Sequence, residues 1–380
     1  MQFSRIRLEN WRNFSEVDVP LQTRAFLVGA NASGKSNFLD VFRFLRDLVL
    51  PGGGFEKAVL SRGGVSSIRN LAARTRTDIA IDVELSEAEN RVWRYRIVFN
   101  QDNNRRPILR EEKVWDSNEN LILNRPISED DRDPARLGQT QLEQIFVNRD
   151  FREVATFFES VNYLHIVPQL IRDPERSIGH QNDPYGGDFL EQIARVNKRS
   201  RQARLKRIQE TLKVVIPQLS VLDWDRDENG IPHLKGKYEH WRPQGAWQQE
   251  NDFSDGTLRL IGLLWALQVG EGPLLLEEPE LSLHPGVIRY LPQLMYRVQR
   301  ARRKAPRQVF VSTHSPELLL DEGIGAQEIY LMVPTKEGTR VIQAASQSDI
   351  IQELEAGLTM ADVVMPRTEP QDLYQMTLWE

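Results

Sequence analysis

The sequence predicts an α/β protein in which both ends of the chain contribute to one mixed sheet. Three observations lead to this fold class. Short apolar runs with strand-like alternation open the chain and return near its end, and amphipathic helical patterns follow them. A long middle segment interrupts this order. Because consecutive elements usually lie next to one another, we expect the two ends to build the sheet around an inserted lobe.

The first part of the chain alternates between strand and helix patterns. FSRIRLEN, SEVDVPL and TRAFLVGA indicate three short strands within the first thirty residues. The apolar residues of KSNFLDVFRFLRDLVL then fall at helical spacing, and Pro51 with three glycines ends the run. Period-two alternation from about Asp78 to Trp115 predicts antiparallel strands.

The middle and the end of the chain carry the remaining elements. Residues 125–140 are polar and contain prolines, which predicts a loop. Apolar positions between Phe189 and Val215 fit one helix face that ends near Pro217. The last part predicts a helix from about Thr257, a strand in PLLLEE, a helix to about Arg303 and a strand in QVFVSTH.

Composition limits the classes of protein that this chain can represent. Its 380 residues are 40% hydrophobic and 27% charged, as in soluble globular proteins. No apolar run reaches the length of a membrane helix, and the N-terminus lacks a signal-peptide core, so we expect a cytoplasmic protein without membrane contact. The absence of cysteine excludes disulfides, thiolate metal sites and a cysteine nucleophile. A net charge of -5 requires any nucleic-acid contact to come from a local basic patch.

A glycine-rich loop between a predicted strand and helix predicts a phosphate site. GANASGKS matches the pattern G-x4-G-K-S/T. Gly29 and Gly34 let backbone N–H groups turn inward around a phosphate, beside the N-terminus of the helix. Lys35 would reach the β- and γ-phosphates, and the Ser36 hydroxyl would bind Mg²⁺. The alternative is a glycine loop that only caps the helix.

Two further segments offer groups for hydrolysis. In PLLLEEPELSLHP, Glu277 and Glu278 follow four strand residues and should point to opposite faces. One can hold the metal through Ser36 and water, and the other can orient or deprotonate the attacking water. His314 follows the strand VFV and could bind a γ-phosphate or that water. The alternatives are a surface glutamate pair and a structural histidine.

These segments, in this order, resemble an ABC-type P-loop ATPase head of the SMC, RecF and OLD group. The resemblance covers the first hundred residues and everything after about residue 250. It implies a mixed sheet core with an antiparallel β lobe and a helical insert lobe. The expected domains are an ATPase core at 1–120 and 250–345, an insert lobe at 121–249, and a C-terminal helix and tail at 346–380.

The resemblance assigns roles to individual residues. IRLENWRNF resembles the opening strand of the group, which implies that Arg12 and Asn13 lie near the nucleotide. GANASGKSNF resembles its Walker A motif, which adds Asn31 and Asn37 to Gly29, Gly34, Lys35 and Ser36. LLLEEPELSLHP resembles its Walker B motif and D-loop, and STHSP its His switch. Glu277 then takes the metal-side place that the family usually fills with aspartate, Glu278 is the catalytic base, and His314 senses the γ-phosphate.

FSDGTLRL stands ahead of the Walker B strand, where the family carries its signature motif. In the family, the signature serine and glycine contact the γ-phosphate bound to the other protomer, so that ATP joins two heads. Ser254 and Gly256 match, whereas Asp255 replaces a glycine and Thr257 a glutamine. A serine at a helix N-terminus is also an ordinary cap. Asp255 either opposes the phosphate electrostatically or points away from it.

The remaining features concern partners. Two basic groups are either solvated helix faces or a sequence-independent track for DNA or RNA; they include Arg199, Arg204 and Arg207 in the insert, and Arg300, Arg303 and Arg307 after the Walker B helix. No glutamine of the sequence stands out as a Q-loop residue. The chain lacks the heptads of a coiled-coil arm, and its end after His314 is too short for a TOPRIM nuclease. The resemblance therefore implies a separate effector protein, such as a nuclease.

The sequence thus predicts an ATPase that uses ATP and Mg²⁺, closes into a homodimer around ATP, and couples closure to DNA or to an effector. Anti-phage defence and genome maintenance both fit this expectation. One alternative is an ATP-gated scaffold or sensor with incidental turnover. A transporter ATPase subunit is less favoured, because the signature departs from the transporter pattern. The acidic and apolar tail TEPQDLYQMTLWE fits either a frayed terminus or a docking segment.

Overall fold

The computed structural model describes residues 1–73, 77–88, 90–177, 183, 185–239, 246–300 and 307–368. The chain packs into two compact units, Met1–Val161 with Glu271–Leu275 and Arg307–Glu380, and Asn162–Gly270 with Leu276–Pro306. These packing units divide the chain at other residues than the predicted core and insert, and the predicted domain bounds stay a prediction.

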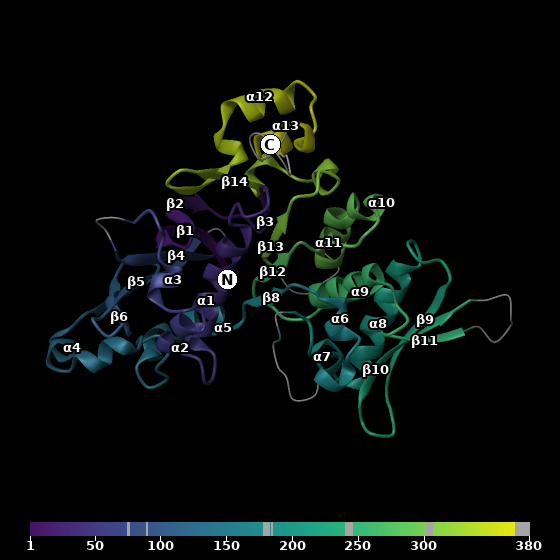
Figure 1. Cartoon of the computed structure of the whole chain (residues 1–380), viewed down its shortest axis with the longest axis horizontal. Coiled ribbons are helices and arrows are strands. Elements are labelled where there is room, and N and C mark those ends of the chain that lie inside the picture. Colours follow the sequence, from purple (N-terminus) through teal and green to yellow (C-terminus); the bar gives the residue numbers. More distant parts are fainter. Residues whose placement is uncertain are drawn as a thin grey trace, which may run out of the picture. The chain divides into compact units, whose positions relative to one another are not determined.

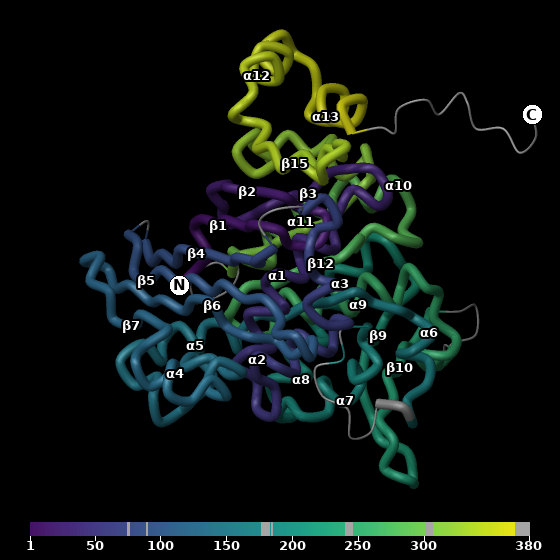
Figure 2. The backbone as a smooth tube through the Cα atoms, turned by 60° about the vertical axis from the view of Figure 1, so that its left-hand side comes forward, coloured from purple at the N-terminus to yellow at the C-terminus, as the bar shows by residue number. Residues whose placement is uncertain are grey.

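An antiparallel sheet forms one layer of the first unit. Its strand order is β2-β1-β4-β5-β6-β7. The strands are β1 Gln2–Trp11, β2 Phe14–Pro20, β4 Ile79–Glu87, β5 Asn90–Gln101, β6 Pro107–Trp115 and β7 Leu121–Arg125. In Figures 1 and 2, β1, β2 and β4 lie side by side, as their pairing requires. The predicted antiparallel strands between Asp78 and Trp115 are therefore confirmed.

A mixed sheet joins the two ends of the chain. In the first unit β3, Arg24–Val28, is parallel to both β13, Val309–Thr313, and β14, Ile329–Thr335, and β15, Gly338–Gln343, is antiparallel to β14. The order continues from β13 to β12, Leu274–Glu277, and β8, Asn162–Leu164. Strand β12 starts in the first unit and ends in the second. The predicted sheet built from both ends is confirmed.

Helix α1, Lys35–Val49, occupies the core of the first unit. Its Phe42 ring lies 4.7 Å from Phe3 of β1 and 4.6 Å from Phe310 of β13, measured between centroids. This aromatic cluster therefore connects both sheets of the unit to α1. The other helices of the unit are α2 Phe55–Leu60, α3 Val65–Ile68, α4 Ser128–Arg132, α5 Arg152–Glu159, α12 Ser348–Glu355 and α13 Met360–Thr368. Short 3-10 helices span Pro134–Gly138, Asn148–Phe151, Leu318–Leu320, Ala326–Glu328 and Ala344–Ser346.

The predicted loop at residues 125–140 is wrong in part, because it contains α4 and a 3-10 turn. Buried Arg125 organises this segment. Its guanidinium donates to both carboxylate oxygens of Asp130, at 2.9 and 3.0 Å, and to Glu112 at 3.2 Å. It also donates to the carbonyls of Arg136 and Gln139. A buried cation needs hydrogen-bond partners of this kind. The polar segment therefore folds around Arg125, because it supplies most of those partners.

The second unit combines helices with a small sheet. Its helices are α6 Pro168–Ile171, α7 Phe189–Arg195, α8 Lys198–Leu212, α9 Asp255–Gln268, α10 Pro285–Ile288 and α11 Leu291–Arg300, with a 3-10 turn at Pro174–Ser177. Strands β9 Leu219–Arg226, β10 Pro232–Tyr238 and β11 Ala246–Gln249 form an antiparallel sheet in the order β11-β10-β9. The segment predicted as a helical insert therefore also carries a sheet.

The helix predicted across Phe189 to Val215 is two helices. Asn197 interrupts the pattern, and its side chain accepts a hydrogen bond from the Ser200 amide at 3.0 Å, which caps α8. A capping asparagine starts a helix more readily than it continues one, although the apolar positions on either side share one helical period. Within the described parts of the chain, none of the helices combines the length and apolar character needed to cross a bilayer.

Candidate functional site

The glycine-rich loop follows the buried strand β3 and ends where α1 begins. Gly34 has φ of 101°, and a Cβ there would come within 2.0 Å of the Asn13 side chain. A Cβ on Gly29 would meet Ser33 Oγ at 2.5 Å and Met332 at 2.9 Å. Only glycine fits both places. The first turn of α1 has neither a side-chain cap nor an acidic residue, so its N-terminus is suited to an anion.

Lys35 and Ser36 stand at this helix start. Lys35 is 5% exposed, and its Nζ donates to the carbonyls of Gly29 at 2.8 Å and Ala30 at 3.0 Å. The ammonium group is therefore held inside the loop. Ser36 is exposed, and so is Asn31 in the middle of the loop. Ser36 thus presents its hydroxyl at the positive end of α1.

Asn13 connects the opening strand to the glycine loop. Its Nδ2 donates to the Ser33 carbonyl at 3.1 Å and to Thr339 Oγ1 at 2.6 Å, and its Oδ1 accepts from Asn37 Nδ2 at 2.8 Å. Thr339 itself donates to the Ser33 carbonyl at 2.8 Å. Asn13, predicted to lie near a nucleotide, therefore holds the glycine loop at the Ser33 carbonyl. Thr339, more than three hundred residues away in sequence, binds the same carbonyl.

Arg12, the other predicted residue of the opening strand, forms an ion pair with Asp40 of α1 at 3.2 Å. Asp40 also pairs with Arg62 at 2.9 Å. Burial raises the pKa of Asp40, but Arg62, Arg43 and Arg12 outweigh it and the net pKa lies below the usual value. The Arg12 guanidinium is therefore committed in part to a structural network beside the loop.

His314 lies at the same edge of the sheet as the glycine loop. Strands β13 and β3 are parallel, and Thr313 pairs with Val28. The next residues, His314 and Gly29, thus leave the sheet side by side. His314 is exposed, whereas Ser312 and Thr313 are fully buried. Ligands of open α/β sheets bind at the carboxyl ends of strands, where this histidine stands.

The adjacent carboxylates Glu277 and Glu278 belong to the second unit. Glu277 ends β12 and accepts a short hydrogen bond from the Tyr163 hydroxyl, while its carbonyl lies 3.3 Å from His165 Nδ1. Glu278 follows with φ of 42° in the left-handed region. The change of backbone region separates the two side chains, so they have different surroundings.

Unusual backbone conformations gather at the predicted motifs. Eight non-glycine residues of the described chain have positive φ, and four of them, Arg12, Ala88, Arg105 and Glu119, lie in the turns between antiparallel strands. Five of the eight, with Arg12 in both groups, belong to the motif segments of the sequence: Asn10, Arg12, Ala32, Glu278 and Ser282. Such conformations cost about 1–3 kcal/mol each and concentrate at functional sites. The strain therefore marks the same segments as the motif patterns.

The predicted signature residues stand at the start of α9. Ser254 caps the helix: its Oγ accepts from the Thr257 amide at 3.2 Å and lies 2.8 Å from Thr257 Oγ1. Gly256 packs against the segment predicted as a D-loop, and a Cβ there would lie 2.7 Å from the Ser282 carbonyl oxygen. Asp255 pairs with Arg172 at 2.7 Å. Ser254 is thus both an exposed cap and part of an exposed helix N-terminus.

The arginines of the two predicted basic groups differ in exposure and in contacts. Arg199 and Arg300 are exposed, Arg204 lies over the Trp265 ring at 5.6 Å, and Arg303 lies outside the described residues. Arg307 is 3% exposed and donates to the carbonyls of Gly272 and Pro273, so its assignment to a surface patch is wrong.

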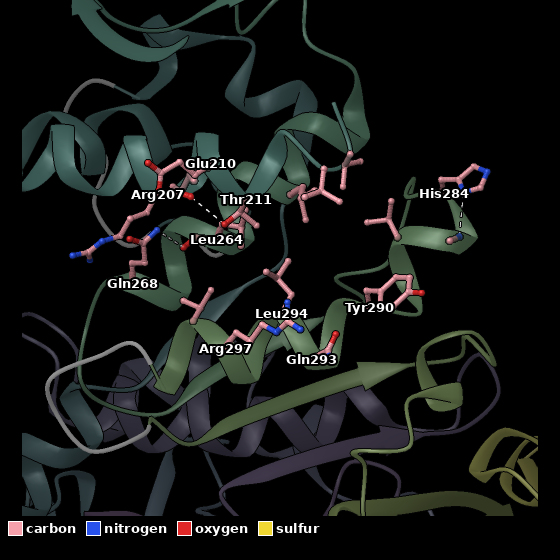
Figure 3. A pocket seen from close by; sticks show the side chains of 17 residues that line it. Arg207, Glu210, Thr211, Leu264, Gln268, His284, Tyr290, Gln293, Leu294 and Arg297 are labelled. Carbon is pink, nitrogen blue, oxygen red and sulfur yellow. Dashed lines mark hydrogen bonds between the residues drawn. The ribbon is translucent and has the colours of Figure 1, made fainter. Parts of the chain in front are cut away.

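Arg207 lines a groove of about 1170 Å³ within the second unit. In Figure 3, Arg207 and Glu210 of α8 line one part of the groove and Tyr290, Leu294 and Arg297 another, with Leu264 of α9 between them. The lining of this groove mixes apolar residues with polar ones such as Glu210 and Gln268, unlike a continuous phosphate track.

Sequence reasoning missed several residues at these places. Thr339 reaches the glycine loop, Tyr163 and His165 contact Glu277, and Arg172 contacts Asp255. None of them lies within or beside the motif that it contacts. No local pattern reports such contacts, because they depend on how distant strands and helices meet.

Comparison with known proteins defines the class of this chain. A family model described as "AAA domain, putative AbiEii toxin, Type IV TA system" matches residues 24–321, more than half of the chain. The chain therefore belongs to this AAA domain family.

Two solved structures and one curated protein are also similar. An SMC head bound to the C-winged helix domain of ScpA is 12% identical with a TM-score of 0.53, over 90% of this chain and 97% of that one. An SMC head domain from Thermotoga maritima is 12% identical with a TM-score of 0.47, over 90% and 99%. Endonuclease GajA of Bacillus cereus (strain VD045) is 41% identical over 58 residues, 15% of this chain and 10% of that protein. The chain thus spans about a tenth of that relative's length.

The likeness to the first SMC head shows the fold. The chain has the mixed α/β fold of an ABC-type P-loop ATPase head. Together with the family match, this confirms the predicted resemblance to the SMC, RecF and OLD group.

Proposed function

We propose that this protein binds ATP with Mg²⁺ and hydrolyses it to ADP and phosphate. The observation that carries the proposal is the glycine loop: an uncapped helix start, two glycines that no other residue can replace, and a buried lysine held in the loop. Family membership and the fold of SMC heads support it.

In this proposal each group has one task. Backbone N–H groups at the start of α1 bind the phosphates, and Lys35 turns from the Gly29 and Ala30 carbonyls towards them. Glu278 accepts a proton from water as the water oxygen forms a bond to the γ-phosphorus. The bond from that phosphorus to the β,γ-bridging oxygen breaks, and ADP leaves with the electron pair. His314 donates a hydrogen bond to the transferred phosphoryl group.

We assign Mg²⁺ to Ser36 and Glu277 on the chemistry of their side chains. Mg²⁺ in such sites uses one or two protein oxygens and completes its shell with water and phosphate, and when bound it neutralises charge on the phosphates. Ser36 offers a hydroxyl, and Glu277 offers the carboxylate that Tyr163 orients. Both are oxygen donors, as this cation prefers.

We further propose that ATP joins two copies of the chain through Ser254 and Gly256, and that closure acts on a separate effector. The exposed Ser254 supports the first part, because its hydroxyl stands at the N-terminus of α9 while it also caps that helix. The similar proteins include an SMC head with bound ScpA and an endonuclease, which supports a partner protein for this chain. We place this coupling in anti-phage defence or genome maintenance. Sequence-independent DNA or RNA is a further proposed partner, through exposed arginines such as Arg199 and Arg300.

Replacing Lys35 tests the phosphate site. We expect Lys35→Ala to weaken ATP binding about 10- to 100-fold, because charged hydrogen bonds to the phosphates are lost. Fluorescence titration with a labelled ATP analogue measures this. Lys57→Ala is the matched control, since Lys57 also donates to a glycine carbonyl, Gly52 at 2.8 Å, away from the loop. Equal affinities of Lys35→Ala and the native chain would refute the assignment.

Replacing Asn13 tests whether its hydrogen bonds keep the glycine loop in the shape that binds ATP. Asn13→Ala removes hydrogen bonds to Ser33 and Thr339. We expect ATP affinity to fall about tenfold, the value of one or two hydrogen bonds, because the loop loses its fixed shape. Asn10→Gly is the control: it removes a hydrogen bond from the same strand to Asp78 and keeps the positive φ. An unchanged affinity in Asn13→Ala would mean that Asn13 does not organise the loop for binding.

A further inference from the structure

Asp255 is the main departure of this chain from the signature pattern, and its surroundings are specific. The carboxylate stands at the first position of α9, between Ser254 and Gly256. A charge of this sign at the helix start competes with any phosphate for the same N–H groups. At contact distances, two like charges near a surface repel by a free energy large enough to change affinity tenfold or more. A working signature therefore needs a counter-charge for Asp255.

Arg172 supplies this counter-charge from outside the motif. It follows helix α6, and its Nη2 lies 2.7 Å from Asp255 Oδ1. The same Nη2 donates to the Phe253 carbonyl at 2.6 Å. Gln169, also on α6, donates to Asp255 Oδ2 at 3.4 Å. All three contacts hold the segment 253–255 against α6 and direct the carboxylate towards that helix.

The second cation near this place has other surroundings. Arg259 lies one turn further along α9, and its Nε is buried without a hydrogen-bond partner among the described residues. Burial lowers the pKa of Arg259, while Asp255, Glu278 and Glu280 act in the opposite direction. Asp255 is thus one of three carboxylates that act on the pKa of Arg259, whereas Arg172 forms the direct ion pair with Asp255.

We propose that Arg172 is a positioning residue of the signature, which neutralises Asp255 and holds it against α6 so that Ser254 and Gly256 can accept a phosphate from a second copy of the chain. This inference rests on the proposed ATP-joined dimer. The ion pair between Arg172 and Asp255 contributes little to the stability of the fold, because its side chains are 26% and 36% exposed.

A cycle of variants tests the proposal: the native chain, Arg172→Ala, Asp255→Asn and the double variant. Dimer affinity is measured by sedimentation velocity with Mg²⁺ and a non-hydrolysable ATP analogue. We expect Arg172→Ala to weaken the dimer about tenfold or more, as contacting residues commonly couple on this scale. Asp255→Asn should equal or exceed the native affinity. The double variant should match Asp255→Asn, because Arg172 has no charge left to neutralise.

Two further measurements and a matched control separate positioning from a structural role. The defect of Arg172→Ala should shrink as salt is raised, since salt screens an exposed carboxylate. ATP affinity of the monomer should stay unchanged in all four chains. Arg226→Ala is the matched control: it removes an exposed ion pair to Glu191, at 3.4 Å in the same unit, and should change none of these values.

The outcomes distinguish this inference from the proposed function. A double variant as weak as Arg172→Ala would overturn the inference alone, because Arg172 would then act only through the Phe253 carbonyl. A native affinity in Arg172→Ala would overturn it as well. A native chain that stays monomeric with the analogue, although it binds it, would overturn the proposed dimer and this inference with it.

Discussion

Glu278→Gln is expected to retain ATP binding and ATP-dependent dimers while turnover falls about 10²- to 10⁴-fold, the usual contribution of a general base. Glutamine keeps the size and the hydrogen-bonding reach of the side chain but cannot accept the proton from water. It also tolerates the left-handed backbone at this position about as well as glutamate does. Steady-state phosphate release measures turnover, and light scattering measures the dimer.

The control for this prediction is Glu228→Gln, an exposed glutamate in the turn between β9 and β10. Its turnover should equal that of the native chain. Native turnover in Glu278→Gln would show that another group activates the water. The same variant separates the enzyme from an ATP-gated scaffold, because a scaffold keeps its function when hydrolysis stops and a cycling enzyme stalls in the closed state.

Ser254→Arg is expected to abolish ATP-dependent dimers and to lower turnover about 10²-fold or more, while the monomer binds ATP as before. The serine is exposed at the start of α9, and a long cationic side chain would fill the place proposed for the partner's phosphate. Losing one preorganised donor to developing charge alone typically costs about 10²- to 10³-fold in rate. Light scattering with ATP, and phosphate release, measure the two effects.

Two controls make this result specific. Ser348→Arg places the same side chain at the exposed first position of α12 and should change neither value. Ser254→Ala removes the cap, which costs about 1 kcal/mol of stability, and a thermal melt reports that loss separately. Unchanged dimers and turnover in Ser254→Arg would reduce Ser254 to an ordinary helix cap.

Much of the fold could be predicted because its signals are local. Alternating and helical periodicity located the three opening strands, α1, the antiparallel strands and β13. The same periodicity predicted one helix where the structure has α7 and α8, because the two helices share one apolar period. Only the capping side chain of Asn197 marks the start of the second helix. It also missed β9, β10 and β11, whose pairing supplies the stabilisation that their sequences lack.

The sequence by itself determined the chemistry that this protein can offer. The glycine loop, the adjacent glutamates and the serine at the start of α9 are each recognisable because a phosphate or a metal needs those residue types at short, fixed spacing. What surrounds them was decided only by tertiary structure. Asn13 and Thr339 meet behind the loop, and Arg172 meets Asp255, because strands and helices distant in sequence pack together.

The clearest case is Asp255. In the sequence it is a negative charge beside a predicted phosphate site, and it could either oppose the phosphate or point away from it. In the structure it is an ion pair with Arg172 at 2.7 Å, directed towards α6. Local sequence cannot report this pairing, since the energy of a charge depends on what lies around it in space and not on its neighbours along the chain.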